Sequence, residues 1–331
     1  MVTLNDIREA QTRLRGIAVR TPLIESYIHQ DRLSSDTRKL YLKPENLQPI
    51  GAFKLRGAYN KIASLTPEEL SRGVITYSSG NHAQGVAYAA RALGAKAVVV
   101  MPKDAPALKR EATAALGAEV VLVGPGSLER QQKAEELAAQ HGYVVVPPYN
   151  DEQIIAGQGT MGLEILEDLP EVETVLVPVG GGGMISGIAS AIKRSSPAVH
   201  VIGAEPELAA DAQASLRSGK LVQLPAEEVS RTLADGLRTQ SLGLITFEHI
   251  RRFVDDIVTV SEYEIRQAMR VLASNPKTVA EPSGTVAVAA FLFHREELPR
   301  TRINVAVISG GNIDAKMLQE IKQEAMQAAS Y

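Results

Sequence analysis

The stretch Val74-Ile75-Thr76-Tyr77-Ser78-Ser79-Gly80-Asn81-His82 joins a short apolar run to an alanine-rich segment at 83–93 that closes at Gly94. The apolar run predicts a buried strand, the small polar residues predict a turn, and the alanine-rich segment predicts a helix. A second apolar run follows at 97–101. A strand, a helix and another strand in this order form a βαβ unit, whose two strands are parallel.

The same alternation continues along the chain. Strand runs at 119–123 and 143–146 alternate with helical patterns at 105–116 and 128–140, and the clearest break is Pro147-Pro148-Tyr149-Asn150-Asp151. Beyond it, helical patterns at 154–166, 184–193 and 208–218 alternate with strand runs at 174–179, 199–204 and 303–308, and 221–231 reads as a loop. Since the runs are apolar on both faces, they predict parallel strands buried between helices. We therefore expect two open-sheet α/β units packed face to face, with a cleft between them at the carboxyl ends of the strands.

Composition excludes several classes of protein. The 331 residues suffice for about two domains, and 22% charged residues with a net charge of −3 and no block of like charges argue against nucleic-acid or membrane partners. No apolar run approaches the roughly 20 residues of a membrane span. The chain has no cysteine, which excludes disulfides, thiol catalysis and cysteine-based zinc sites. We expect a cytoplasmic protein.

A lysine between small residues stands in Gly51-Ala52-Phe53-Lys54-Leu55-Arg56-Gly57-Ala58. Small neighbours let a flat molecule approach the amine, and burial would lower its pKa by disfavouring the charged form. An uncharged amine can attack a carbonyl carbon and form a Schiff base. On this stretch alone, a surface lysine that opens a helix is the simpler interpretation, and the motifs downstream change that balance.

Four successive glycines, Gly180, Gly181, Gly182 and Gly183, lie between a predicted strand and a predicted helix. Backbone without side chains can aim several N–H groups at one anion, and the helix that follows adds its positive N-terminal end. A tight turn is the plain alternative, but four glycines carry a large entropic cost for a turn alone. The run matches neither the dinucleotide-binding nor the P-loop fingerprint. We expect it to bind a phosphate.

Three further turns carry polar groups. Ser78-Ser79-Gly80-Asn81-His82 suits a carboxylate, with His82 more naturally a structural donor than a catalyst, and Ser309-Gly310-Gly311-Asn312 places a hydroxyl at a strand end, where a plain turn is the alternative. Glu205, the Ala209 carbonyl and Asp211 lie within a short loop that suits a hard cation. A pair of caps for the helix expected at 208 explains the two carboxylates equally well.

The order of these motifs resembles the fold-type II pyridoxal-phosphate enzymes, specifically the threonine/serine dehydratase and serine racemase family, over residues 21–312. Connecting sequences agree: Ala156-Gly157-Gln158-Gly159-Thr160, Ala204-Glu205-Pro206, Ala234-Asp235-Gly236 and Glu281-Pro282. The resemblance implies a tryptophan synthase β-like architecture, with two open-sheet α/β domains and a cofactor cleft between them. Residues 1–72 and 149–331 would form the large cofactor-binding domain, and residues 73–148 the small α/β domain.

The resemblance also implies how pyridoxal 5'-phosphate is held. Lys54 looks like the Schiff-base lysine, Phe53 would pack against the cofactor ring, Asn81 would hydrogen-bond its phenolic oxygen, and Ser309 would face its pyridine nitrogen. Gly180, Gly181, Gly182 and Gly183, with the Met184 amide, would hold the phosphate.

Substrate and metal contacts follow from the same resemblance. Ser78, Asn81 and His82 would bind the substrate carboxylate, and Ser79 matches the serine that acts as acid/base in racemases on the face opposite the lysine. Glu205, Ala209 and Asp211 match the divalent-cation site of the family, for Mg²⁺ or another divalent ion. A homodimer is also implied.

The implied activity is dehydration and deamination of a β-hydroxy amino acid, L-threonine or L-serine, to a 2-oxo acid and ammonia. Lys54, displaced by substrate, would be a free amine placed to take the Cα proton. A serine at the ring nitrogen would leave that nitrogen uncharged, which favours prompt loss of the β-hydroxyl. Three alternatives stay open: a serine or hydroxyaspartate racemase/dehydratase, a specialised catabolic dehydratase, and a phosphometabolite-binding protein without chemistry.

One departure from the family pattern concerns specificity. Family members often read Thr-Gly-Ser-Phe-Lys, whereas this chain reads Ile50-Gly51-Ala52-Phe53-Lys54. We expect Ala52 and the loop at Tyr149 and Asn150 to determine which substrate side chain is accepted.

Overall fold

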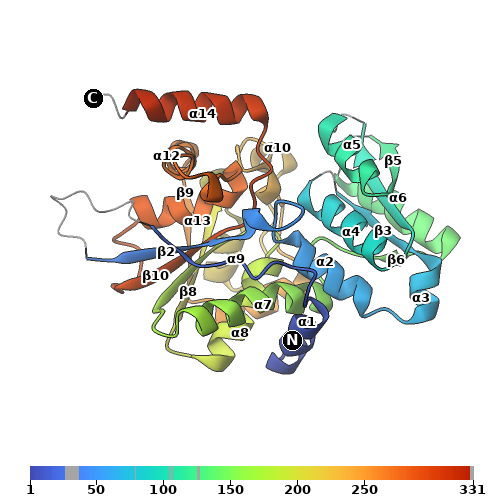
Figure 1. Cartoon of the computed structure of the whole chain (residues 1–331), viewed down its shortest axis with the longest axis horizontal. Coiled ribbons are helices and arrows are strands. Elements are labelled where there is room, and N and C mark those ends of the chain that lie inside the picture. Colours follow the sequence, from blue (N-terminus) through green and yellow to red (C-terminus); the bar gives the residue numbers. More distant parts are fainter. Residues whose placement is uncertain (27–36, 79, 104, 106, 125–126, 329–331) are drawn as a thin grey trace.

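A computed structural model describes residues 1–26, 37–78, 80–103, 105, 107–124 and 127–328, and Figure 1 shows how their helices and strands are arranged. Two sheets organise the chain. The larger has the strand order β1-β2-β10-β7-β8-β9 and the smaller the order β5-β4-β3-β6. The expected fold class, two open α/β sheets, is confirmed.

Within the larger sheet, every neighbouring pair is parallel except the edge pair β1–β2, which is antiparallel. Its strands are β1 (Ile24–Ser26), β2 (Lys39–Pro44), β7 (Thr174–Pro178), β8 (His200–Pro206), β9 (Asp256–Val260) and β10 (Ile303–Ile308). Side chains alternate between two apolar layers: Val305 and Val307 of β10 face one layer, and Ala306 and Ile308 face the other. Burial on both faces explains why the strand runs are continuously apolar.

The smaller sheet is parallel throughout and lies on the right of Figure 1. Its strands are β3 (Val74–Tyr77), β4 (Ala97–Pro102), β5 (Glu119–Val123) and β6 (Val144–Val145). Val74 pairs with Ala97 and Tyr77 with Val100, so β3, the turn after it, the helix α4 (Asn81–Ala92) and β4 form the expected βαβ unit.

Helices connect the strands as the alternation predicts. They are α1 (Leu4–Arg13), α2 (Lys54–Ala63), α3 (Pro67–Arg72), α4 (Asn81–Ala92), α5 (Ala107–Ala115), α6 (Ser127–His141), α7 (Glu152–Asp168), α8 (Gly183–Ser195), α9 (Asp211–Ser218), α10 (Ala226–Val229), α11 (Leu244–Phe253), α12 (Glu262–Leu272), α13 (Pro282–Phe293) and α14 (Ala315–Ala328), with single 3₁₀ turns η1 (Glu45–Leu47), η2 (Glu207–Ala209), η3 (Asp235–Leu237) and η4 (Pro276–Thr278). Within the described ranges, no helix is long and apolar enough to span a bilayer.

Two local expectations were wrong. The helix expected at 208–218 is the 3₁₀ turn η2 followed by α9, which begins at Asp211. The loop expected at 221–231 contains the short helix α10, which begins directly after Pro225. Pro225 lacks an N–H and has a restricted φ, which suits the start of a helix and offsets the otherwise polar sequence.

Three helices approach one another closely through glycines and thereby fix Lys54 relative to the glycine run. A Cβ on Gly157 of α7 would lie 2.6 Å from the Arg56 carbonyl oxygen of α2, and a Cβ on Gly187 of α8 would lie 2.3 Å from the Ile155 carbonyl oxygen. Only residues without a side chain allow these approaches. Helix α7 therefore joins the helix that begins at Lys54 to the helix that follows the glycines.

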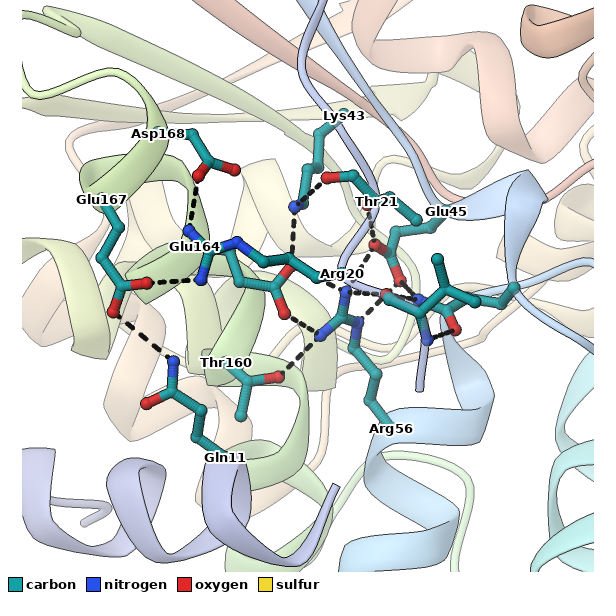
Figure 2. A network of polar contacts seen from close by, with 12 residues as sticks. Gln11, Arg20, Thr21, Lys43, Glu45, Arg56, Thr160, Glu164, Glu167 and Asp168 are labelled. Atoms are coloured by element: carbon teal, nitrogen blue, oxygen red, sulfur yellow. Dashed lines mark hydrogen bonds and ion pairs between the residues drawn. The ribbon is translucent and has the colours of Figure 1, made fainter. Parts of the chain in front are cut away.

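A buried network of charges anchors α2 to the large sheet (Figure 2). The Arg56 network comprises Lys43, Glu45, Arg56 and Glu164, whose side chains are at most 8% exposed. Arg56 donates to both carboxylates, with Nε–Oε2 of Glu45 at 2.7 Å and Nη1–Oε1 of Glu164 at 2.6 Å. Lys43 Nζ donates to Glu164 Oε2 at 2.6 Å. The two positive and two negative charges balance, as buried charges require.

Candidate functional site

Backbone pairing holds the lysine loop against the end of the last strand. The Phe53 N–H donates to the Ser309 carbonyl oxygen at 3.1 Å, the Gly311 N–H donates to the Gly51 carbonyl oxygen at 2.9 Å, and Ala52 and Gly310 form an isolated antiparallel bridge. Lys54 is the first residue of α2, directly after this bridge. The lysine stretch and the motif Ser309-Gly310-Gly311-Asn312 therefore lie together.

The Lys54 side chain is half-buried, and no carboxylate among the described residues pairs with its amine. Its Nζ donates to the Pro148 carbonyl oxygen at 2.7 Å and lies 5.2 Å from the centroid of the Phe53 ring. Burial disfavours the charged amine and lowers the pKa of Lys54 to about 8. The lowered pKa expected from the small neighbours is confirmed, and the amine is poised to react with a carbonyl carbon.

Asn81, at the start of α4, joins the turn that begins at Ser78 to the motif that ends at Asn312. Its Oδ1 accepts a hydrogen bond from Asn312 Nδ2 at 2.7 Å, and its Nδ2 donates to Glu281 Oε1 at 2.6 Å. Asn312 Nδ2 also donates to the Ile50 carbonyl oxygen at 2.9 Å. Asn81, of the smaller-sheet unit, is therefore tied to the loop of Lys54 and to the end of β10.

The glycine run offers free donors. Gly182 has φ +87° and precedes α8, and within the described part of the chain no acceptor is paired with the backbone N–H groups of Gly181, Gly182, Gly183 and Met184. A Cβ on Gly181 would lie 2.3 Å from Cδ1 of the Tyr149 ring, so the ring packs directly on the loop. Unpaired N–H groups at a helix N-terminus suit an anion.

Ser309 lies at the end of β10 and is 4% exposed. Its hydroxyl donates to the Ser283 carbonyl oxygen at 3.4 Å, which is at the long limit for a hydrogen bond. Ser283 Oγ accepts from the Gly236 N–H at 2.8 Å. The Ser309 hydroxyl thus has a weak partner and can turn toward a ring nitrogen.

His82 matches the structural interpretation. Its Nε2 lies 2.9 Å from the Val146 carbonyl oxygen, and because a carbonyl only accepts, Nε2 carries the proton. Burial, with the Lys54 charge second, lowers the pKa of His82 to about 3, so the ring is neutral. In this tautomer the ring has no second N–H to donate, and the expected role of His82 in binding the substrate carboxylate stays a prediction.

Two serines, Ser78 and Ser79, precede His82 in this stretch of the sequence. Ser78 Oγ accepts from the Gly80 N–H at 3.3 Å. Ser79 lies outside the described residues, so its role as acid/base stays a prediction.

The carboxylates expected to hold a cation behave differently from each other. Glu205 caps α9, accepting the Gln213 N–H at 2.7 Å and the Ala212 N–H at 3.3 Å. Both Asp211 carboxyl oxygens are buried without a hydrogen-bond partner in the described structure, and burial raises the pKa of Asp211 to about 7. Burial and the charge of Asp211 also hold the pKa of Glu205 well above its usual range. No group of three His, Cys, Asp or Glu side chains in the described ranges could hold a metal ion.

Sequence reasoning missed two groups at this site. The Pro148 carbonyl carried no chemical signal, because any residue supplies a carbonyl. Glu281 counted only as a connecting residue, yet it is buried at the N-cap position of α13 and makes no side-chain cap there. The Pro at the first helical position marks a helix start but not the direction of the glutamate.

Together these groups suit a flat molecule that carries an aldehyde and a phosphate. The weakly basic Lys54 amine would react with the aldehyde, and the unpaired N–H groups of the glycine run would hold the phosphate. Asn81 and Ser309 supply polar groups for the atoms of a ring.

Comparisons with known proteins agree with this chemistry. Residues 14–310 match the family model described as "Pyridoxal-phosphate dependent enzyme". The chain is 43% identical over 314 residues to the L-threo-3-hydroxyaspartate ammonia-lyase of Saccharomyces cerevisiae, covering 95% of this chain and 94% of the relative. It is 47% identical over 321 residues to an L-threonine ammonia-lyase of Thermotoga maritima, covering 97% and 78%.

Solved structures agree as well. The structure of maize serine racemase superposes with a TM-score of 0.91 at 36% identity, covering 100% of this chain and 99% of that chain. A lysine with a lowered pKa, a glycine run before α8 and a matching family model over most of the sequence place the chain in one family. The chain belongs to the pyridoxal-phosphate-dependent enzymes of fold type II.

Proposed function

We propose that the protein removes water and ammonia from a β-hydroxy amino acid, L-threonine or L-serine, and releases a 2-oxo acid. The observation that carries the proposal is the Lys54 amine, whose pKa is lowered to about 8. It donates to the Pro148 carbonyl oxygen, and the next residue, Tyr149, packs its ring on the glycine run. Relatives named as ammonia-lyases of threonine and hydroxyaspartate support this choice of substrate class.

Each residue of the site has a role in this proposal. Lys54 holds the cofactor and, once released, takes a proton from the substrate Cα. Residues 180–184 hold the phosphate, Phe53 packs against the ring, and Ser309 faces the ring nitrogen. Ser78 and the N-terminal turn of α4 bind the substrate carboxylate. When bound, pyridoxal phosphate supplies a conjugated system that accepts the electrons left at Cα.

The visible absorption spectrum of the protein loaded with pyridoxal phosphate, before and after L-threonine or L-serine is added, tests the proposal. A band that changes while a 2-oxo acid accumulates supports it. A band that changes without 2-oxo acid redirects the assignment to racemisation or to another amino acid. Absence of a band after cofactor is added overturns it and leaves a phosphate-binding protein.

Replacing Gly181 with alanine is expected to weaken cofactor binding. The new Cβ would lie 2.3 Å from the Tyr149 ring, so the loop or the ring must move and at least one phosphate hydrogen bond is lost. Loss of one charge-assisted hydrogen bond corresponds to an increase in Kd of about tenfold or more, measured by titrating the apoprotein. In Gly180→Ala the new Cβ would lie 3.3 Å from its nearest neighbour, Cα of Leu237, so this control is expected to lose less cofactor affinity. Equal losses in both variants would contradict the role given to Gly181.

A divalent cation at Glu205, the Ala209 carbonyl and Asp211 is part of the proposal, supported by the two unpartnered oxygens of Asp211. Mg²⁺ or Ca²⁺ at roughly 100 times its Kd is expected to raise the thermal midpoint by about 5 °C. Asp211→Asn should abolish that rise and leave the metal-free protein no less stable, because a neutral amide costs less to bury than a charge. Glu207→Gln, at an exposed neighbouring residue, should keep the rise. A rise that persists in Asp211→Asn would place the cation elsewhere.

Racemase activity is the second candidate, supported by the likeness to maize serine racemase. Racemisation needs an acid/base group on each face of the substrate Cα, and Ser79 would supply the second. Ser79→Ala is expected to abolish formation of the D-isomer and to spare elimination from the L-isomer, measured by chiral chromatography and 2-oxo acid release. A parallel fall of both activities would show that Ser79 is not a dedicated second base.

The oligomeric state, the cellular location and the domain boundaries are also part of the proposal. The family resemblance supports a homodimer, and the relatives named above, which act on amino acids, support a cytoplasmic location. The assignment of β3, β4, β5 and β6 to a separate sheet supports a small domain at 73–148 within a large domain of 1–72 and 149–331.

A further inference from the structure

Glu281 is a buried carboxyl at the N-cap position of α13 that does not cap its own helix. Its Oε1 instead accepts from Asn81 Nδ2 at 2.6 Å, across 200 residues of sequence. A Cβ on Gly310 would lie 2.3 Å from that oxygen and 3.1 Å from Asn81 Nδ2. Gly310 therefore leaves room for the Glu281 carboxyl to reach Asn81, because a side chain at this position would collide with the carboxyl.

The orientation of the Asn81 amide follows from a chain of donors that begins at a backbone carbonyl. The Ile50 carbonyl oxygen can only accept, so the group of Asn312 that faces it at 2.9 Å is the Nδ2 donor. The same Nδ2 lies 2.7 Å from Asn81, so Asn81 presents Oδ1 to it. Asn81 Nδ2 then faces Glu281, and a flipped amide would set donor against donor and acceptor against acceptor.

This arrangement leaves the Asn81 amide with one N–H that no described residue accepts. Of its two donors, one is held by Glu281, and its oxygen is held by Asn312. The remaining N–H has a single direction, because both other contacts are fixed. A donor of fixed direction is what an electron-rich ring oxygen requires.

We infer that Glu281 is a positioning residue, which acts through Asn81 by aiming the remaining Asn81 N–H at the phenolic oxygen of pyridoxal phosphate. The inference rests on the proposed cofactor role of Asn81. It adds a residue that touches neither cofactor nor substrate in this role, and it explains why a carboxyl is buried beside the lysine loop and the end of β10.

The protonation of Glu281 is compatible with this role. Burial, with the charge of Asp235 second, raises the pKa of Glu281 to about 7, while the Asn81 hydrogen bond and the charge of Lys109 act in the opposite direction. Asp235 of η3 pairs with Lys109 of α5 at 2.8 Å. A carboxyl that carries a proton still has an oxygen free to accept from Asn81, so the clamp holds in either protonation state.

A double-mutant cycle on the cofactor-loaded protein without substrate tests the inference. Asn81→Ala and Glu281→Ala are each expected to shift the visible absorption band in the same direction and to raise the Kd for pyridoxal phosphate by about tenfold. The double variant should match Asn81→Ala within about twofold, because residues acting as one unit are not additive. Glu281→Gln, whose amide oxygen can accept from Asn81, should restore the wild-type band and Kd.

Each outcome decides the matter. Additive effects in the double variant, a Glu281→Ala band like that of the wild type, or a Glu281→Gln variant as impaired as Glu281→Ala would overturn the inference. If Glu281→Ala does not fold, Glu281→Asp replaces it, since loss of one methylene withdraws the acceptor from Asn81. Absence of any band in the wild-type protein would instead remove the proposed function, so the two failures are distinguishable.

Discussion

Replacing Lys54 with alanine is expected to remove the visible band of bound pyridoxal phosphate and to lower turnover of any β-hydroxy amino acid by a thousandfold or more, on the order of what general acid–base groups contribute. Lys54 is proposed both to hold the cofactor and to move the Cα proton. Its amine has a lowered pKa, and it begins α2 directly after the bridge between Ala52 and Gly310. Because one amine serves both roles, the two losses are expected together.

The lowered pKa of Lys54 also predicts how the rate of cofactor loading depends on pH. At pH 7, an amine of pKa about 8 is roughly 10% uncharged, about 200 times the fraction for an amine at the usual value near 10.4. Since only the uncharged amine attacks an aldehyde, loading of the apoprotein should accelerate as the pH rises from 6 toward 8 and level off above it. Lys54→Arg, which stays charged at any accessible pH, should load no better than Lys54→Ala.

Lys61 supplies the matched control, because it lies on the same helix α2 and pairs with Asp151 at 2.7 Å, where both side chains are 18% exposed. Lys61→Ala should keep the band and the turnover, with a loss of stability of about 1–3 kcal/mol, because the mostly buried Asp151 loses a charged donor. Circular dichroism of each apoprotein checks the fold. A Lys54→Ala protein that loses turnover but keeps the band would show that another amine holds the cofactor.

The sequence predicts the main parts of the site because parallel strands end at one edge of a sheet. The glycine run and Ser309 each follow a predicted strand, so the strand pattern predicts one region for them, and the family resemblance adds Lys54 to it. The alternation of apolar runs predicts the strands to within one or two residues, as at Val74–Tyr77 and Ile303–Ile308. The short 3₁₀ turns, α3 and α10 carry too few residues for a periodic signal.

Contacts between distant elements could not be predicted in this way. Asn81 and Glu281 are 200 residues apart, and Lys109 and Asp235 are 126 apart, so their meeting depends on how the two sheets face each other. The Arg56 network escapes sequence reasoning for another reason. Charged residues are mostly exposed, so nothing in the sequence indicates that Arg56 and Lys43 are buried, whereas both are at most 1% exposed.

Replacing Arg56 with methionine is expected to lower the free energy of unfolding by about 3–5 kcal/mol, the cost of leaving a buried charge without its partner. Glu45 and Glu164 would keep their negative charges against Lys43 alone, although their side chains are at most 8% exposed. Arg56 also donates to Thr160 Oγ1 and to the Val19 carbonyl oxygen, and these acceptors would lose a donor. Urea unfolding followed by circular dichroism measures the loss.

Arg20 provides a control of the same chemistry at the rim of the network, where Figure 2 shows it between Glu167 and Asp168. Its side chain is 47% exposed, so water replaces its partners when it is removed. Arg20→Met is therefore expected to cost no more than about 1 kcal/mol. Equal losses for Arg20→Met and Arg56→Met would show that burial is not what makes the Arg56 network costly to break.

Restoring the charge balance of the Arg56 network is expected to recover part of the stability that Arg56→Met loses. In Arg56→Met the buried group carries one positive and two negative charges, and adding Glu164→Gln returns it to one of each. Arg56→Met/Glu164→Gln should therefore unfold at higher urea than Arg56→Met, although Glu164→Gln alone, which leaves two positive charges against one negative, destabilises the wild type. A double variant weaker than Arg56→Met would mean that the hydrogen bonds of Glu164, rather than its charge, dominate. Because Arg56 lies in the first turn of α2 with Lys54, the same variants should lose cofactor affinity in the order in which they lose stability.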